Sequence, residues 1–187
     1  MNGSADADWC WQLAAPLAPP SLAHWFQDTG SLTARLRLHC QQFRVQLLNT
    51  RANVPLTPSQ ADWLGETHAY CREVLLLCDE QPWVYASSLY SPAALEALPA
   101  LGGLGEKALG ELLFDNPQLV RSRLEFAQLT ESCYQTLTAQ LAAPLSRFSA
   151  ADDASMLPWA RRSILAIPKA QVLVSELFLP AACAYRE

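Results

Sequence analysis

The sequence predicts an α+β fold: a single antiparallel sheet of about six strands with helices on one face. Two observations lead to this class. Apolar segments of strand length recur along the whole chain and are joined mostly by short turns, which favour antiparallel hairpins. Short capped segments lie between them, and such helices can cover one face of the sheet. With 187 residues, 51% of them hydrophobic, the whole chain, residues 1–187, is expected to form one domain with a sizeable core.

The predicted strands differ in how their apolar residues are arranged. In chain order they are residues 42–49, 69–78, 83–90, 121–129, 161–167 and 171–180. The first alternates apolar and polar side chains with a period of two, as a half-buried strand does. The second, AYCREVLLLC, is a more continuous apolar run. The turn DEQP joins it to its hairpin partner WVYASSLY, and the last two strands form a hairpin across Pro168 and Lys169.

Cap residues and glycines mark the helices between the strands. The predicted helices are residues 22–30, 31–40, 91–98, 107–114 and 130–149, the last with a break at Pro144. Residues 57–66 are predicted to form a short helix or a turn. Gly102, Gly103 and Gly105 permit unusual backbone angles before the helix at 107–114. Residues 1–20, which end in a Pro-rich stretch, are expected to be an extended lead-in.

Composition and motifs exclude several classes of protein. A formal net charge of −5 argues against non-specific nucleic-acid binding, which needs a basic surface. The six cysteines form no CxxC pair, so the sequence predicts no zinc site. The chain is large enough to fold without a disulfide framework, so the cysteines are expected to be small buried residues in a reducing compartment. Motifs for serine hydrolases, zinc proteases and nucleotide binding are absent. With no signal peptide pattern and no apolar run of membrane-spanning length, the chain is expected to be cytoplasmic.

Two ionisable residues lie inside apolar strands. Arg72 shares a face with Tyr70, Val74 and Leu76, and Glu176 shares a face with apolar residues of its own strand. Because an unpaired buried charge is costly, one interpretation is a structural ion pair, either with each other or with Glu73 and with Arg161 or Arg162. The other is a closed pocket in which Arg72 binds a ligand carboxylate and Glu176 acts as an acid, a base or a hydrogen-bond acceptor.

Four segments in register resemble the chorismate pyruvate-lyase family. They are CREVLLLCDEQPWVYA, KALGELLF, PWARRS and VSELFLP, and the similarity runs from about Trp25 to Tyr185. The resemblance implies a bacterial lyase that converts chorismate to 4-hydroxybenzoate and pyruvate, opening the ubiquinone pathway. It also implies flap segments over an internal pocket, and no metal or organic cofactor. The expected partners are the small-molecule substrate and product, bound by a monomer.

The resemblance also implies the site residues. Arg72 in REVLL matches the arginine that binds the ligand, and Glu176 in ELFLP matches the glutamate, so these two are the expected catalytic residues. Leu109, just before the glycine of the LG pair, is expected to contact the ligand through its backbone. Leu32 in GSLTARL matches a contact at a helix end, more loosely. Within this site the counter-charge expected for Glu176 is Arg72.

Two departures from the family pattern stand out. Relatives commonly have an arginine at the position of Ser87, so a second guanidinium aimed at the pocket could be lost, with Arg161 or Arg162 as a replacement. The segment 130–153 is longer than expected and is interpreted as a surface insertion.

Three hypotheses therefore remain open. The first is a chorismate lyase, and the second is a non-catalytic module of the same fold that binds an aromatic acid as an effector. The third is a partner-binding scaffold in which Arg72 and Glu176 are purely structural.

Overall fold

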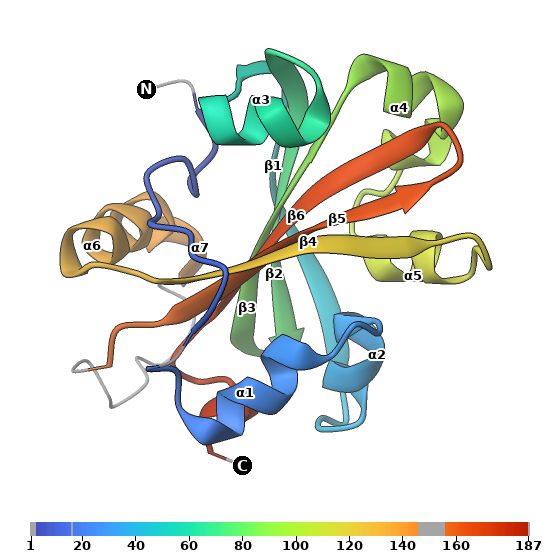
Figure 1. The fold of residues 1–187 in the computed structure, drawn as a ribbon. Helices are drawn as coiled ribbons and strands as arrows, with labels where there is room; N and C mark the ends of the chain where they lie inside the picture. The colour runs from blue at the N-terminus through green and yellow to red at the C-terminus, as the bar shows by residue number, and fades with distance from the viewer. Residues whose placement is uncertain (1–2, 16, 146–155, 187) are drawn as a thin grey trace.

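The computed structural model describes residues 3–15, 17–145 and 156–186. In these residues the chain forms one six-stranded sheet in the order β1-β2-β3-β6-β5-β4, with every neighbouring pair antiparallel (Figure 1). The prediction of a single antiparallel sheet of about six strands is confirmed. The strands are β1 (Phe43–Pro55), β2 (His68–Cys78), β3 (Gln81–Tyr90), β4 (Val120–Gln128), β5 (Trp159–Ile167) and β6 (Ala170–Phe178).

A tight turn connects the two strands of each hairpin, β2–β3 and β5–β6. Asp79 and Glu80, between β2 and β3, have φ values of 48° and 61°. Positive φ at both central residues is the geometry whose twist matches that of the flanking strands in a two-residue hairpin. Lys169, between β5 and β6, has a φ of 68°. Both turns lie where the sequence predicts them.

The helices are short and most begin at a capping residue. They are α1 (Pro20–Gln27), α2 (Leu32–Arg37), α3 (Pro58–Leu64), α4 (Pro92–Ala97), α5 (Leu109–Phe114), α6 (Glu131–Gln140) and α7 (Ala142–Leu145), with 3-10 turns η1 (Pro99–Leu101) and η2 (Cys183–Tyr185). The side chains of Ser31, Thr57, Ser91 and Thr130 each accept a hydrogen bond from a backbone N–H of the first turn, at α2, α3, α4 and α6.

Helices cover both faces of the sheet, so the prediction that they cover one face is wrong. On one side, here called the pocket face, Val74 and Leu76 of β2 pack in one cluster with residues of α1 and α2. On the other side, the back face, Leu75 and Leu77 of β2 pack with residues of α6. A strand buried on both faces has a continuous apolar run in place of an alternating one. The run LLLC in β2 was therefore the signal for two covered faces.

The order of the strands explains what covers the pocket face. After β3 the chain passes over this face through α4, η1 and α5, and then enters β4 at the far edge of the sheet (Figure 1). Leucines of these helices pack against Tyr90, Val172 and Val174 of the sheet. Helices α1 and α2, which precede β1, cover the rest. Two segments far apart in the sequence thus form one cover.

The N-terminal segment and α6 lie against the back face. Residues 5–8 turn where an extended lead-in was expected, and Asp6 is buried and accepts a hydrogen bond from Ser175 of β6 at 2.6 Å. Helix α6 belongs to the segment interpreted as a surface insertion, yet it buries Leu137 in the back-face cluster. The remainder of that segment, from residue 146 to 153, lies outside the described residues.

The burial of Leu137 makes a stability prediction. Leu137→Ala should lower the free energy of unfolding by about 2–5 kcal/mol, because it leaves a cavity between α6 and the sheet. Denaturant unfolding measures the change. The control is Gln140→Ala on the same helix, where the side chain is exposed and the expected change is within about 0.5 kcal/mol. Equal effects of the two substitutions would mean that α6 does not contribute to the core.

Candidate active site

A small cavity lies between the pocket face of the sheet and its cover. All four residues predicted for the site, Leu32, Arg72, Leu109 and Glu176, line it. The cavity leaves about 40 Å³ for the centres of water-sized molecules, whereas ligand pockets commonly measure about 300–1,000 Å³. A ring-sized ligand therefore requires the cover to shift outward.

A larger cleft of about 930 Å³ lies on the back face, between the N-terminal segment, β1 and α6. The arginine that lines it is paired: Arg51 lies 3.2 Å from the carboxylate of Glu73, and Tyr85 donates a hydrogen bond to the same carboxylate at 2.6 Å. The cavity on the pocket face is smaller, but its charges are not matched in this way. We therefore take the smaller cavity as the candidate site.

Arg72 enters the cavity from β2 and is 3% exposed. Its Nη2 donates to the backbone carbonyls of Gly105 and Lys107, at 2.9 and 2.8 Å. Its buried Nε has no hydrogen-bond partner among the described residues. Burial lowers the pKa of Arg72 below the ordinary arginine value, because the cation has lost its water. Arg72 thus holds the chain before α5 while it keeps one buried donor unused.

Glu176 enters from β6, is 7% exposed, and pairs with arginines other than Arg72. The Nε of Arg161 donates to its Oε2 at 2.6 Å, and the Nη1 of Arg121 lies 3.7 Å from the same oxygen. The expected pairing of Glu176 with Arg72 is therefore wrong. Arg72 lies opposite Ser88 in the β2–β3 register, while Glu176 lies opposite Ala86. Because β3 lies between their strands, their backbones are about 10 Å apart across the sheet and about 7 Å along it.

Leu32 and Leu109 are the first residues of two helices that meet above the cavity. Leu32 begins α2 and Leu109 begins α5. A Cβ atom on Gly110 would lie 2.9 Å from the Oγ of Ser31, so the absence of a side chain at Gly110 allows this close approach. The N–H groups in the first turn of a helix have no acceptor within the helix. The two helix starts therefore place first-turn N–H groups beside the cavity, from both halves of the cover.

Ser87 does not face the cavity, so the concern that a pocket-facing guanidinium is lost at this position is wrong. In β3 the residues that line the cavity are Ala86 and Ser88. Ser87 points to the back face, where its Oγ lies 3.7 Å from the Sγ of Cys71. The period of two in a strand puts neighbouring residues on opposite faces.

The neighbouring residues Arg161 and Arg162 also point to opposite faces of the sheet. Arg161 points to the pocket face and binds Glu176, whereas Arg162 points to the back face and donates to Glu125 at 2.6 Å. Of the two arginines that could supply a guanidinium on the pocket face, only Arg161 is on the correct side of β5.

Arg121 of β4 is the residue that sequence reasoning missed. Its side chain is 5% exposed and lines the cavity, while the neighbouring Val120 is largely exposed. In an edge strand the apolar residues usually face the core and the charged residues face solvent. Here Val120 is exposed and the side chain of Arg121 is buried, which is the reverse. The register pairs Arg121 with Leu165, which also lines the cavity. That pairing is set by the tertiary fold, and the local pattern RSRLEFAQL gives no sign of it.

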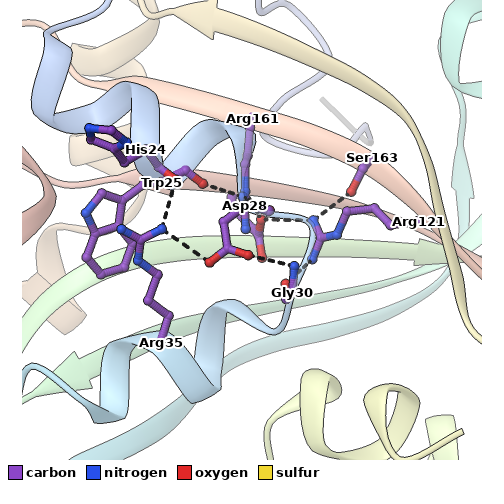
Figure 2. Close-up of polar contacts among 9 residues, drawn as sticks. His24, Trp25, Asp28, Gly30, Arg35, Arg121, Arg161 and Ser163 are labelled. Carbon is purple, nitrogen blue, oxygen red and sulfur yellow. Dashed lines mark hydrogen bonds and ion pairs between the residues drawn. The ribbon is translucent and has the colours of Figure 1, made fainter. Parts of the chain in front are cut away.

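Arg161 and Arg121 also hold the chain between α1 and α2, as Figure 2 shows. Nη1 of Arg161 donates to the carbonyl oxygens of Trp25 and Asp28, at 2.6 and 2.9 Å. Nη2 of Arg121 donates to the carbonyl of Gly30 at 3.2 Å, and its Nη1 donates to Ser163 at 3.0 Å. The arginines at the site therefore fix the cover: Arg72 holds the part before α5, and Arg161 and Arg121 hold the part before α2.

The described residues contain neither a candidate metal site nor a candidate membrane span. Within them, no group of three or more His, Cys, Asp or Glu side chains is placed to hold a metal ion. No helix formed by them is long and apolar enough to cross a membrane.

Comparison with known proteins gives one family. The family model described as chorismate lyase matches residues 6–186. A protein of Pseudoalteromonas translucida (strain TAC 125), named probable chorismate pyruvate-lyase, is 37% identical over 186 residues, which is 97% of each chain. One of the same name from Shewanella amazonensis is 40% identical over 166 residues, or 88% of this chain and 82% of the relative.

A solved structure shares the fold. The effector domain of PhnF from Mycobacterium smegmatis matches 82% of this chain and 90% of its own, with a TM-score of 0.53 and 15% sequence identity. At this identity the likeness concerns the fold alone.

Proposed function

Because this chain belongs to the chorismate lyase family, we propose that it converts chorismate to 4-hydroxybenzoate and pyruvate. One observation supports this most: Arg72 and Glu176 line one buried cavity from strands that are not neighbours. Once the cover shifts outward, a ring with a carboxylate at one end and a hydroxyl at the other could lie between the two side chains. In this proposal Arg72 binds the ring carboxylate with its planar guanidinium. The backbone N–H groups at Leu32 and Leu109 add hydrogen bonds.

The proposed reaction is an elimination that makes the ring aromatic. A proton leaves the ring carbon that carries the hydroxyl, and the electrons of that C–H bond enter the ring. The neighbouring C–O bond breaks, its electron pair goes to the enolpyruvyl oxygen, and the enol takes up a proton to give pyruvate. Because aromatisation drives the step, the protein contributes mainly orientation and charge placement. Glu176 accepts the hydrogen bond of the ring hydroxyl and lies where it could assist the proton transfer.

The assay that tests this function uses purified protein and chorismate, with the products identified by mass. We expect 4-hydroxybenzoate and pyruvate in equal amounts without added metal. The protein should come from a host that lacks its own chorismate lyase, so that a contaminant cannot supply the activity. No product at any enzyme concentration would contradict the proposal. We also propose a cytoplasmic location and a supply of 4-hydroxybenzoate to ubiquinone synthesis, which complementation of a lyase-deficient strain tests.

A second candidate function is binding of an aromatic acid without turnover, because the fold is shared with an effector domain. Calorimetric titration with 4-hydroxybenzoate, run beside the turnover assay, separates the two. Binding without product formation favours the effector module, and turnover favours the lyase.

A further inference from the structure

The groups under the cover carry more positive than negative charge. The guanidinium groups of Arg72, Arg121 and Arg161 lie on the pocket face with one buried carboxylate, that of Glu176, so the described groups have a surplus of two positive charges. The carboxylate of Asp28 also acts on Arg121, but it is ion-paired with Arg35 at 3.2 Å. Buried charge without a partner is costly. A ligand that relieves the whole surplus would carry two negative charges.

Two of the three arginines keep an unused donor. The Nε of Arg161 donates to Glu176, and its Nη1 donates to two carbonyls of the cover. The Nε atoms of Arg72 and Arg121, in contrast, are buried without a hydrogen-bond partner among the described residues. Buried donors are nearly always satisfied in folded proteins. The cavity therefore offers two separate guanidinium positions to a ligand.

Arg121 lies next to Glu176, the residue whose carboxylate accepts the hydrogen bond of the ring hydroxyl in the proposed function. Its Nη1 is 3.7 Å from the Oε2 of Glu176. Arg72 lies on the same face but on β2, four strand spacings across the sheet from β4, which is about 19 Å between backbones. In chorismate the enolpyruvyl ether is on the ring carbon next to the hydroxyl, and the ring carboxylate is opposite. A hydroxyl at Glu176 thus places the enolpyruvyl group near Arg121 and the ring carboxylate towards Arg72.

We propose that Arg121 binds the carboxylate of the enolpyruvyl group and so makes the site specific for a dianionic substrate. This inference rests on the proposed function and deepens it. In the reaction, Arg121 would stay beside the leaving group while negative charge develops on the enolpyruvyl oxygen, where a fixed cation favours C–O cleavage. The product 4-hydroxybenzoate has one carboxylate, so it uses Arg72 and leaves Arg121 without an anion. Arg121 then contributes to binding of the substrate but not of the aromatic product.

The test compares two ligands in one variant, Arg121→Gln. We expect kcat/KM for chorismate to fall by about ten- to a hundredfold, the range of one charge-assisted contact. The dissociation constant of 4-hydroxybenzoate, measured by calorimetry, should change by less than about threefold. Arg123→Gln is the matched control, because Arg123 lies on the same strand but pairs with Asp62 at the surface.

Other outcomes overturn the proposal. Equal weakening of chorismate and 4-hydroxybenzoate would mean that Arg121 acts only through Glu176, which touches both ligands. An unchanged kcat/KM would mean that Arg121 has no role in substrate binding. If Arg121→Gln does not fold, as judged by its thermal unfolding, Arg121→Lys replaces it, because it keeps the charge but loses the planar fork. The same selective loss is expected for it.

Failure of the proposed function is distinguishable from failure of this inference. If the wild-type protein does not turn over chorismate, calorimetry with chorismate itself replaces kinetics. A selective loss of chorismate affinity in Arg121→Gln would then still support the dianion site, and no selective loss would overturn it.

Discussion

Arg72→Gln is expected to lower kcat/KM for chorismate by about a thousandfold, through the loss of a charge-assisted pair with the ring carboxylate and of two hydrogen bonds to the cover. The guanidinium of Arg72 donates to the carbonyls of Gly105 and Lys107, so its loss also frees the chain before α5. Affinity for 4-hydroxybenzoate should fall as well, which separates Arg72 from Arg121. Steady-state kinetics and calorimetry measure the two effects.

The stability of this variant distinguishes a binding role from a structural one. Among the described residues, no carboxylate forms an ion pair with Arg72, so removing its charge relieves part of the positive surplus. Because the substitution also removes two hydrogen bonds to the cover, we expect the free energy of unfolding to fall only modestly, by about 1–3 kcal/mol. Arg44→Gln, which breaks an exposed pair with Glu80, is the control for loss of an arginine elsewhere. A large loss of stability with little loss of activity would favour the partner-binding scaffold.

Glu176→Gln should affect both activity and stability. The substitution keeps the shape but removes the anion from between Arg161 and Arg121. Breaking a buried pair in this way costs about 3–5 kcal/mol of unfolding free energy. The value of kcat should fall at least about a hundredfold, since the contact with the hydroxyl and any assistance to proton transfer weaken together. Denaturant unfolding and single-turnover kinetics measure the two quantities.

Glu125→Gln is the matched control for Glu176→Gln. Glu125 pairs with Arg162 on the back face at 2.6 Å. Arg162 follows Arg161 directly in β5. This control should also lose stability but should keep kcat, because it is on the side of the sheet away from the cavity. A Glu176→Gln variant with normal kcat would remove Glu176 from the proposed chemistry.

Local patterns were enough to predict the elements of the fold. Alternation in residues 42–49, the apolar run in residues 69–78 and the turn signals between strands predicted the six strands, because side-chain period and turn chemistry are local properties. The same run contained the sign that both faces are covered. The prediction of one-sided cover treated the hairpins as half-exposed, although LLLC in β2 has no polar face.

The candidate site was only partly predictable. Arg72 and Glu176 were identified because a charge within an apolar strand is a local anomaly, and the family resemblance added Leu32 and Leu109. All four do line one cavity. Their ligand contacts remain proposals. The partner expected for Glu176 within the site, Arg72, was wrong, whereas Arg161, one of the alternatives given for a structural ion pair, is the partner found. Sequence distance says nothing about which strands become neighbours, so it could not decide between them.

The sequence by itself determined the strands, the turns and which side chains share a face, because these follow from a period of two residues. Only the tertiary structure decided that Arg161 and Arg121, rather than Arg72, surround Glu176. It also decided that Ser87 lies on the back face and that two distant helix starts close the cavity. The physical reason is the strand order: β6 lies between β3 and β5, and a buried charge pairs with the groups that its neighbouring strands bring within reach.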